Sequence, residues 1–126
     1  MTNLKSLIIG CGKIAGINDD RRSSFVGHAK AYDMVPGIGC VCFVDKDIKK
    51  CKALSERYQP SKYSTNLKFA LHEYRPDIIS VCTPDETHYS TVIEILGNEF
   101  LPKVIFLEKP ACQTSEQLEE MVKISK

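Results

Sequence analysis

Short runs of apolar residues alternate along the chain with longer stretches whose apolar residues recur at helical spacing. The short runs are apolar almost throughout and rich in β-branched residues, which is typical of strands buried on both faces of a parallel sheet. We therefore predict strands over residues 4–9, 40–44, 78–82 and 104–107, and a weaker strand near Lys62 and Tyr63.

Three longer stretches have the period of an amphipathic helix. They cover residues 47–58, residues 85–96 with a stop at Gly97, and the segment from Thr114 onward, where Thr114 and Gln117 have the spacing of a capping box. The faces expected to pack inward are Ile48, Cys51, Leu54, Ser55 and Tyr58, then His88, Val92, Ile95 and Leu96, and finally Leu118, Met121 and Val122.

Strand and helix patterns thus follow one another in β-α-β-α order. This order predicts an α/β fold, namely a Rossmann-like doubly wound parallel sheet of five to six strands with right-handed crossovers and helices on both faces. A chain of 126 residues has room for one such domain and not for two.

Composition excludes several classes of partner. Lys and Arg number 17 against 16 Asp and Glu, a formal charge of +1, so no basic surface is expected for nucleic acid or an anionic membrane. The 6 cysteines include no C-x-x-C pair, and no histidine pair has zinc-like spacing, so neither a metal site nor a disulfide framework is predicted. Free thiols and the lack of a signal-peptide pattern favour a cytoplasmic location.

The first predicted strand runs directly into Gly10-Cys11-Gly12-Lys13-Ile14-Ala15, which matches the dinucleotide-binding pattern G-x-G-x-x-A. In that pattern the first glycine makes the tight turn, the second lets a pyrophosphate approach the backbone, and the small third residue allows helix and strand to pack closely. The helix expected to follow would offer free N–H groups to phosphates. An ordinary glycine turn is the alternative interpretation.

Asp45 closes the second predicted strand, where a carboxylate can accept both hydroxyls of the adenosine ribose and repel a 2′-phosphate. This favours NAD over NADP, although Lys46 adjoins it, and a plain helix-capping role for Asp45 stays open. The acid lies 30 residues after Ala15, against about 20 in the usual pattern. The additional residues fall in the polar segment 17–27. We interpret this segment as a loop inserted into the first helix, which we expect to resume at His28.

Two further motifs follow the later strands, Thr83-Pro84-Asp85-Glu86-Thr87-His88 and Glu108-Lys109-Pro110. Together with the glycine turn, the segment His28-Ala29-Lys30-Ala31-Tyr32 and Asp45, they resemble the N-terminal domain of the Gfo/Idh/MocA oxidoreductases, a family named for glucose-fructose oxidoreductase and inositol dehydrogenase. The resemblance extends over essentially the whole chain, in the same order.

The resemblance implies specific roles. Lys109 would be the catalytic residue, helping to bind a sugar-type substrate and to tune proton transfer. The cofactor-binding residues would be Gly10, Gly12, Lys13, Ile14, Ala15, Asp45, Thr83, Pro84, His88, Glu108, Lys109 and Pro110. Residues 1–126 would then be the NAD(P)-binding domain of a longer homo-oligomeric enzyme, a fragment without the family's C-terminal α/β domain, able to bind cofactor but not to turn over substrate.

Other interpretations stay open at this point. Lys109 could be a surface lysine before a turn, and His88 a core-facing helix residue. A non-catalytic nucleotide-sensing or CoA-binding module also uses a glycine turn, and a methyltransferase also places an acid after its second strand. Since X-Pro bonds can be cis, we also expect a cis bond between Lys109 and Pro110.

Overall fold

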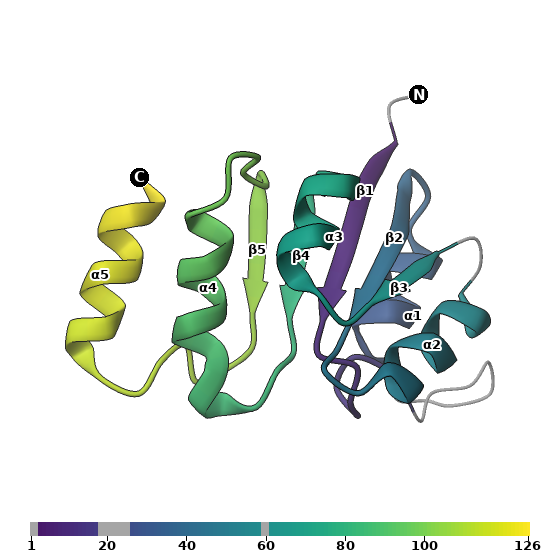
Figure 1. The fold of residues 1–126 in the computed structure, drawn as a ribbon, viewed down its shortest axis with the longest axis horizontal. Coiled ribbons are helices and arrows are strands. Elements are labelled where there is room, and N and C mark those ends of the chain that lie inside the picture. Colours follow the sequence, from purple (N-terminus) through teal and green to yellow (C-terminus); the bar gives the residue numbers. More distant parts are fainter. Residues whose placement is uncertain (1–2, 18–25, 59–60) are drawn as a thin grey trace.

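A computed structural model describes residues 3–17, 26–58 and 61–126, and within them the chain forms a parallel sheet of five strands. The sheet order is β3-β2-β1-β4-β5 (Figure 1). The strands are β1 (Leu4–Ile9), β2 (Ile38–Val44), β3 (Lys62–Ser64), β4 (Ile78–Val81) and β5 (Val104–Leu107). The predicted parallel α/β fold is therefore confirmed, and the weak strand near Lys62 is β3.

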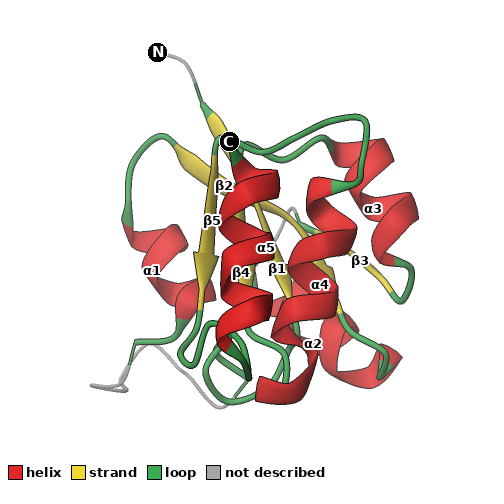
Figure 2. Ribbon diagram, turned by 90° about the vertical axis from the view of Figure 1, so that its left-hand side faces the viewer, coloured by secondary structure: helices red, strands yellow, loops and turns green. Residues whose placement is uncertain are grey.

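Helices cover both faces of the sheet, as predicted (Figure 2). They are α1 (His28–Met34), α2 (Ile48–Arg57), α3 (Leu67–Tyr74), α4 (His88–Leu96), preceded by a 3₁₀ turn at Asp85–Thr87, and α5 (Ser115–Ser125). One core layer joins α1 and α2 to the sheet through Ile8 and Phe43. The other joins α3, α4 and α5 to it through Leu7 and Ile79.

Helix α3 is absent from the sequence prediction. Its signal was present, because Leu67, Ala70, Leu71 and Tyr74 have helical spacing and the Asn66 side chain caps the helix by accepting from the Phe69 N–H.

Three predicted inward positions are wrong. Ile48 is 54% exposed, since it lies in the first turn of α2, beyond the packed Cys51 and Leu54. Leu118 and Val122 are exposed because α5 packs chiefly against α4, and among the described residues of α5 only Met121 is buried.

The first helix is spliced across the polar segment. In a continuous α-helix each carbonyl accepts from the residue four positions on. Here the Ile14 carbonyl accepts from the His28 N–H at 3.1 Å, and that of Ala15 from the Ala29 N–H at 2.9 Å. Each separation is 14 residues, ten more than in a continuous helix. The expected resumption at His28 is confirmed, while residues 18–25 of the predicted insertion lie outside the described part.

The cysteine side chains follow the sequence prediction. All six thiols are free, and four of them, Cys11, Cys42, Cys51 and Cys82, are buried. Burial raises the pKa of the Cys42 thiol to about 12. Among the described residues, no helix combines the length and apolarity that crossing a membrane requires.

Candidate functional site

The site begins at Gly10, where β1 ends between the ends of its two neighbouring strands. The Gly10 N–H donates to the Val44 carbonyl of β2 at 2.7 Å. Its φ is +89°, and a Cβ at this position would lie 2.6 Å from the Cys82 carbonyl carbon and oxygen. A side chain has no room here because backbone cannot move aside cheaply, so the turn requires glycine.

Gly12 differs from Gly10 because a Cβ built on it meets nothing within 4 Å. The backbone then makes a single helical turn, with the Gly16 N–H donating to the Gly12 carbonyl at 3.2 Å. One helical turn therefore follows the glycines before the interruption of the first helix that the sequence predicts. Arg57 of α2 closes the turn by donating from Nη1 to the Gly16 and Ile17 carbonyls, both at 2.9 Å.

The last three residues of the glycine motif do not line the nucleotide-sized cleft at this edge of the sheet. Lys13 and Ile14 are exposed, and Ala15 is fully buried against the core that includes Ile8 and Ala29. Ala15 therefore matches the close helix-to-strand packing expected of it.

Asp45 lies at the end of β2 and reaches toward the glycine turn. Its Oδ2 accepts from the Cys11 N–H at 2.6 Å, and its Oδ1 accepts from the Asp47 N–H at 2.7 Å. The cap of α2 is Asp47, which accepts from the Lys49 N–H. Asp45 is therefore not the helix cap, and each of its carboxylate oxygens keeps capacity for a further donor.

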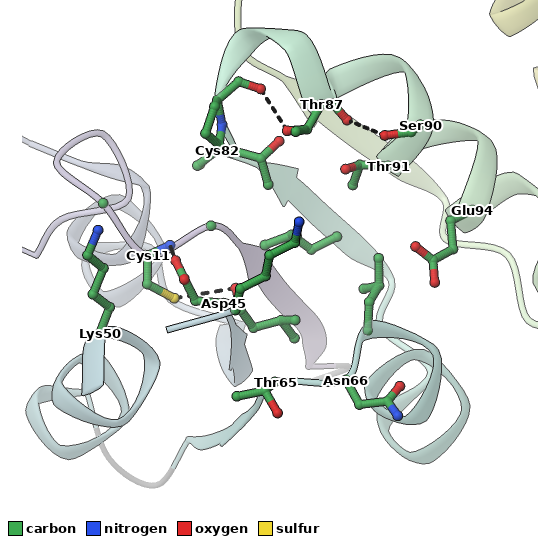
Figure 3. Close-up of a pocket in the computed structure, with 18 of the residues that line it drawn as sticks. Cys11, Asp45, Lys50, Thr65, Asn66, Cys82, Thr87, Ser90, Thr91 and Glu94 are labelled. Atoms are coloured by element: carbon green, nitrogen blue, oxygen red, sulfur yellow. Dashed lines mark hydrogen bonds between the residues drawn. The ribbon is translucent and has the colours of Figure 1, made fainter. Parts of the chain in front are cut away.

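A cleft with a volume of about 1010 Å³ opens where β1 and β4 end, the point at which the strand order reverses. Figure 3 shows that its side chains come from opposite sides, with Lys50, Thr65 and Asn66 facing Thr87, Ser90 and Glu94. In open α/β sheets this crevice is where ligands bind. From the predicted set, the cleft is lined by Gly10, Gly12, Asp45, Thr83 and Pro84.

Sequence reasoning missed Lys50, Thr65, Asn66, Ser90 and Glu94 as cleft residues. The signal available for Thr65 and Asn66 is their position directly after β3, because the carboxyl ends of parallel strands meet at one edge of the sheet. The sequence holds no comparable signal for the α4 residues, because packing decides which side of that helix faces the cleft.

Thr83 follows β4 and faces the same cleft. Its Oγ1 is buried and has no hydrogen-bond partner among the described residues. Such an atom is rare in a folded protein and calls for a partner beyond those that the described residues supply. The neighbouring Cys82 thiol stays protonated, because burial, with a smaller contribution from the Glu108 charge, raises its pKa to about 12.

His88 is fully buried and does not line the cleft. Its Nδ1 lies 2.6 Å from the Pro110 carbonyl oxygen and its Nε2 lies 2.9 Å from the Thr83 carbonyl oxygen. The structure therefore places His88 between two loops that follow different strands, where it contacts backbone rather than open space. The role expected of His88 beside the dinucleotide stays a prediction.

The Glu108-Lys109-Pro110 segment lies after β5, outside the residues that line the cleft. Glu108 Oε1 is 2.6 Å from His28 Nε2. Lys109 is exposed and has no ion pair within the described residues, and the bond between Lys109 and Pro110 is cis, as expected.

Comparison with known proteins agrees with this architecture. The profile of the GFO_IDH_MocA family, described as "Oxidoreductase family, NAD-binding Rossmann fold", matches residues 4–126. D-glucoside 3-dehydrogenase of Escherichia coli (strain K12) is 29% identical over 118 residues, which make up 94% of this chain and 30% of that protein. The chain thus spans less than a third of that relative's length.

Solved structures show the same fold. The WlbA dehydrogenase from Chromobacterium violaceum, in complex with NADH and UDP-GlcNAcA, superimposes with a TM-score of 0.81 at 25% identity, covering 99% of this chain and 32% of that one. KijD10, a 3-ketoreductase from Actinomadura kijaniata in complex with NADP and TDP-benzene, gives 0.77 at 19% identity, covering 98% and 34%. With a profile match over nearly its entire length, the chain belongs to the Gfo/Idh/MocA oxidoreductase family, of which it is the NAD-binding Rossmann domain.

Proposed function

We propose that the cleft holds NAD and that the whole protein transfers hydride between NAD and a hydroxyl or carbonyl group of a sugar, sugar derivative or polyol. When bound, the nicotinamide ring supplies the hydride chemistry. The observation that carries the proposal is the open space over Gly12, bordered by Asp45 and by the unpartnered Thr83 hydroxyl. The residues present therefore fit a dinucleotide.

The two ends of the cleft would take different parts of the cofactor. We assign the pyrophosphate to the backbone of Gly10–Gly12, where no side chain intervenes. The Asp45 carboxylate would accept hydroxyls of the adenosine ribose through its remaining lone pairs, and the Thr83 hydroxyl would find its missing partner in the ligand.

Preference for NAD over NADP would depend on Asp45. A carboxylate at that position repels a 2′-phosphate, and its two backbone bonds hold it in place. Lys46 and Lys50 line the same cleft and would weaken that repulsion, so the preference is expected to be moderate.

Glu108 and Lys109 would serve the nicotinamide end. An exposed ammonium at Lys109 can donate a hydrogen bond to the substrate oxygen whose proton moves during hydride transfer. For residues 1–126 by themselves we propose cofactor binding without turnover, because the cleft they form accounts for the dinucleotide alone.

Isothermal titration calorimetry of the 126-residue chain tests the assignment. NAD is expected to bind, Gly12→Ala to weaken binding because a methyl group enters the open space, and Lys109→Ala to leave binding of ADP unchanged. In the longer protein, Lys109→Ala is expected to remove turnover while NAD still binds. Binding of CoA or adenosylmethionine in place of NAD would overturn the proposal.

A further inference from the structure

Four side chains form a continuous hydrogen-bonded chain that ends on the carboxylate of the Glu108-Lys109-Pro110 segment. The Tyr32 hydroxyl lies 2.6 Å from Ser80 Oγ, Ser80 Oγ lies 2.8 Å from His28 Nδ1, and His28 Nε2 lies 2.6 Å from Glu108 Oε1. Tyr32 and Ser80 are buried, whereas the His28 and Glu108 side chains are 19% and 32% exposed. This series of hydrogen bonds thus leads from the core toward the surface.

The donor and acceptor capacities of the four side chains fix the direction in which each of these hydrogen bonds is donated. A carboxylate only accepts, so His28 must donate from Nε2 to Glu108. In a neutral imidazole the other nitrogen then accepts, which makes Ser80 the donor to Nδ1. The Ser80 oxygen in turn accepts from the Tyr32 hydroxyl, so every hydrogen in the chain has a partner.

The opposite direction leaves a buried hydrogen unpaired. If His28 donated from Nδ1 to Ser80 Oγ, either the Ser80 hydroxyl hydrogen or the hydrogen of the Tyr32 hydroxyl would need another acceptor. Within the described residues, Ser80 Oγ is the one hydrogen-bond partner of that hydroxyl. Leaving a buried donor without a partner is costly, so the buried end of the chain fixes the tautomer at the exposed end.

We propose that His28 is a positioning residue that holds Glu108 with one oxygen engaged and the other available to a ligand. Glu108 Oε2 makes no hydrogen bond within the described residues. Resting on the proposed function, in which Glu108 serves the nicotinamide end of the cofactor, this oxygen would accept a hydrogen bond from a hydroxyl of the nicotinamide-side ribose.

The spliced helix places His28 for this role. His28 is the first residue of α1, and its backbone N–H is held by the Ile14 carbonyl just beyond the glycine turn. On the other side of Lys109, the Pro110 carbonyl contacts His88. The segment that carries Lys109 is therefore held by one histidine before it and by another after it.

Three ligands separate the two halves of the cofactor. ADP carries the adenosine and pyrophosphate, ADP-ribose adds the second ribose, and NAD adds the nicotinamide. We expect His28→Leu to raise the Kd for both ADP-ribose and NAD about tenfold, because a hydrogen bond to a charged group is lost. The Kd for ADP should change less than about twofold, since the adenosine half lies elsewhere.

Matched variants separate positioning from general damage. His28→Gln keeps an N–H that can donate to Glu108 and should recover most of the lost affinity. His72→Leu makes the same kind of change at an exposed helix position against Phe100 and should alter no Kd. Equal weakening of all three ligands by His28→Leu, or no weakening of any, would overturn the inference.

A second measurement does not depend on ligand binding. In ¹⁵N-labelled protein, imidazole nitrogen shifts report which ring nitrogen carries hydrogen. His28 is expected as the Nε2–H tautomer, and Ser80→Ala should move the Nδ1 resonance. An Nδ1–H tautomer would overturn the inference even if NAD binds. If no nucleotide binds but the Nε2–H tautomer is found, the proposed function fails while the hydrogen-bonded chain stands.

Discussion

Replacing Gly10 by alanine tests how β1 is joined to β4. The added Cβ would lie 2.6 Å from the Cys82 carbonyl group and 2.7 Å from the Thr83 nitrogen, at a φ of +89°. The backbone conformation costs alanine about 1–2 kcal/mol, and overpacking costs about 1–3 kcal/mol more. After the small gain of about 0.4–1 kcal/mol from restricting the unfolded chain, we expect a loss of about 1–5 kcal/mol.

Two other glycines separate these contributions. Gly37 has a φ of +88° but a Cβ on it would meet nothing within 4 Å, so Gly37→Ala should show the backbone cost alone, about 1 kcal/mol. Gly12 has neither a positive φ nor a close neighbour, so Gly12→Ala should change stability by less than about 0.5 kcal/mol.

The assay is urea unfolding at pH 7 and 25 °C, followed by circular dichroism. The free energy of unfolding should fall in the order Gly12→Ala, Gly37→Ala, Gly10→Ala, with similar m values. If Gly10→Ala were as stable as Gly37→Ala, the close contact between Gly10 and the Cys82 carbonyl would be refuted. Gly12→Ala should be the variant that folds normally and yet binds NAD weakly.

Further predictions concern charge, protonation and the splice. Asp45→Asn should lower the ratio of NAD to NADP affinity about tenfold in calorimetry, because the charge that repels a 2′-phosphate is removed; an unchanged ratio would contradict the role given to Asp45. Burial raises the pKa of the Cys42 thiol to about 12, so the folded chain holds this proton more tightly than the unfolded chain, whose thiols titrate near about 8.5. That stabilisation is complete below about pH 8 and is lost as the pH rises toward 12, by at most about 1.4 kcal/mol per pH unit. Urea unfolding should give a lower free energy of unfolding at pH 10 than at pH 8, and the decrease should be smaller in Cys42→Ala. An equal decrease in the two proteins would contradict this account of Cys42. Arg57→Leu should cost about 1–3 kcal/mol by leaving the Gly16 and Ile17 carbonyls without the guanidinium, with Lys52→Leu as an exposed control on the same helix.

Local patterns predicted the sheet well because most of its strands are short, nearly unbroken runs of apolar residues. The predicted runs 4–9 and 104–107 coincide with β1 and β5, and the run 40–44 misses only the first residues of β2. Those first residues include Gly39, whose lack of a side chain breaks the apolar run. The sequence prediction missed helix α3 because the helix is short and only two of its side chains, Ala70 and Leu71, are buried.

The site was predicted as far as its residues belong to a local motif. Gly10, Gly12 and Asp45 follow directly from strand ends, and the structure brings them together at the cleft. His88 shows the limit of such reasoning. Its place in a motif suggested contact with a ligand, whereas its burial and its two carbonyl partners depend on how two distant loops pack.

The splice at the start of α1 changes how length along this chain should be counted. The Ile14 and Ala15 carbonyls take their partners from His28 and Ala29, ten positions later than in a continuous helix. Subtracting these ten positions from the 30 between Ala15 and Asp45 gives the interval of about 20 residues of the usual pattern. Strand register is set by residues outside this interruption. Ten residues are thus added between the glycine turn and α1, while the hydrogen bonds that the Ile14 and Ala15 carbonyls accept from α1 are those of an uninterrupted helix.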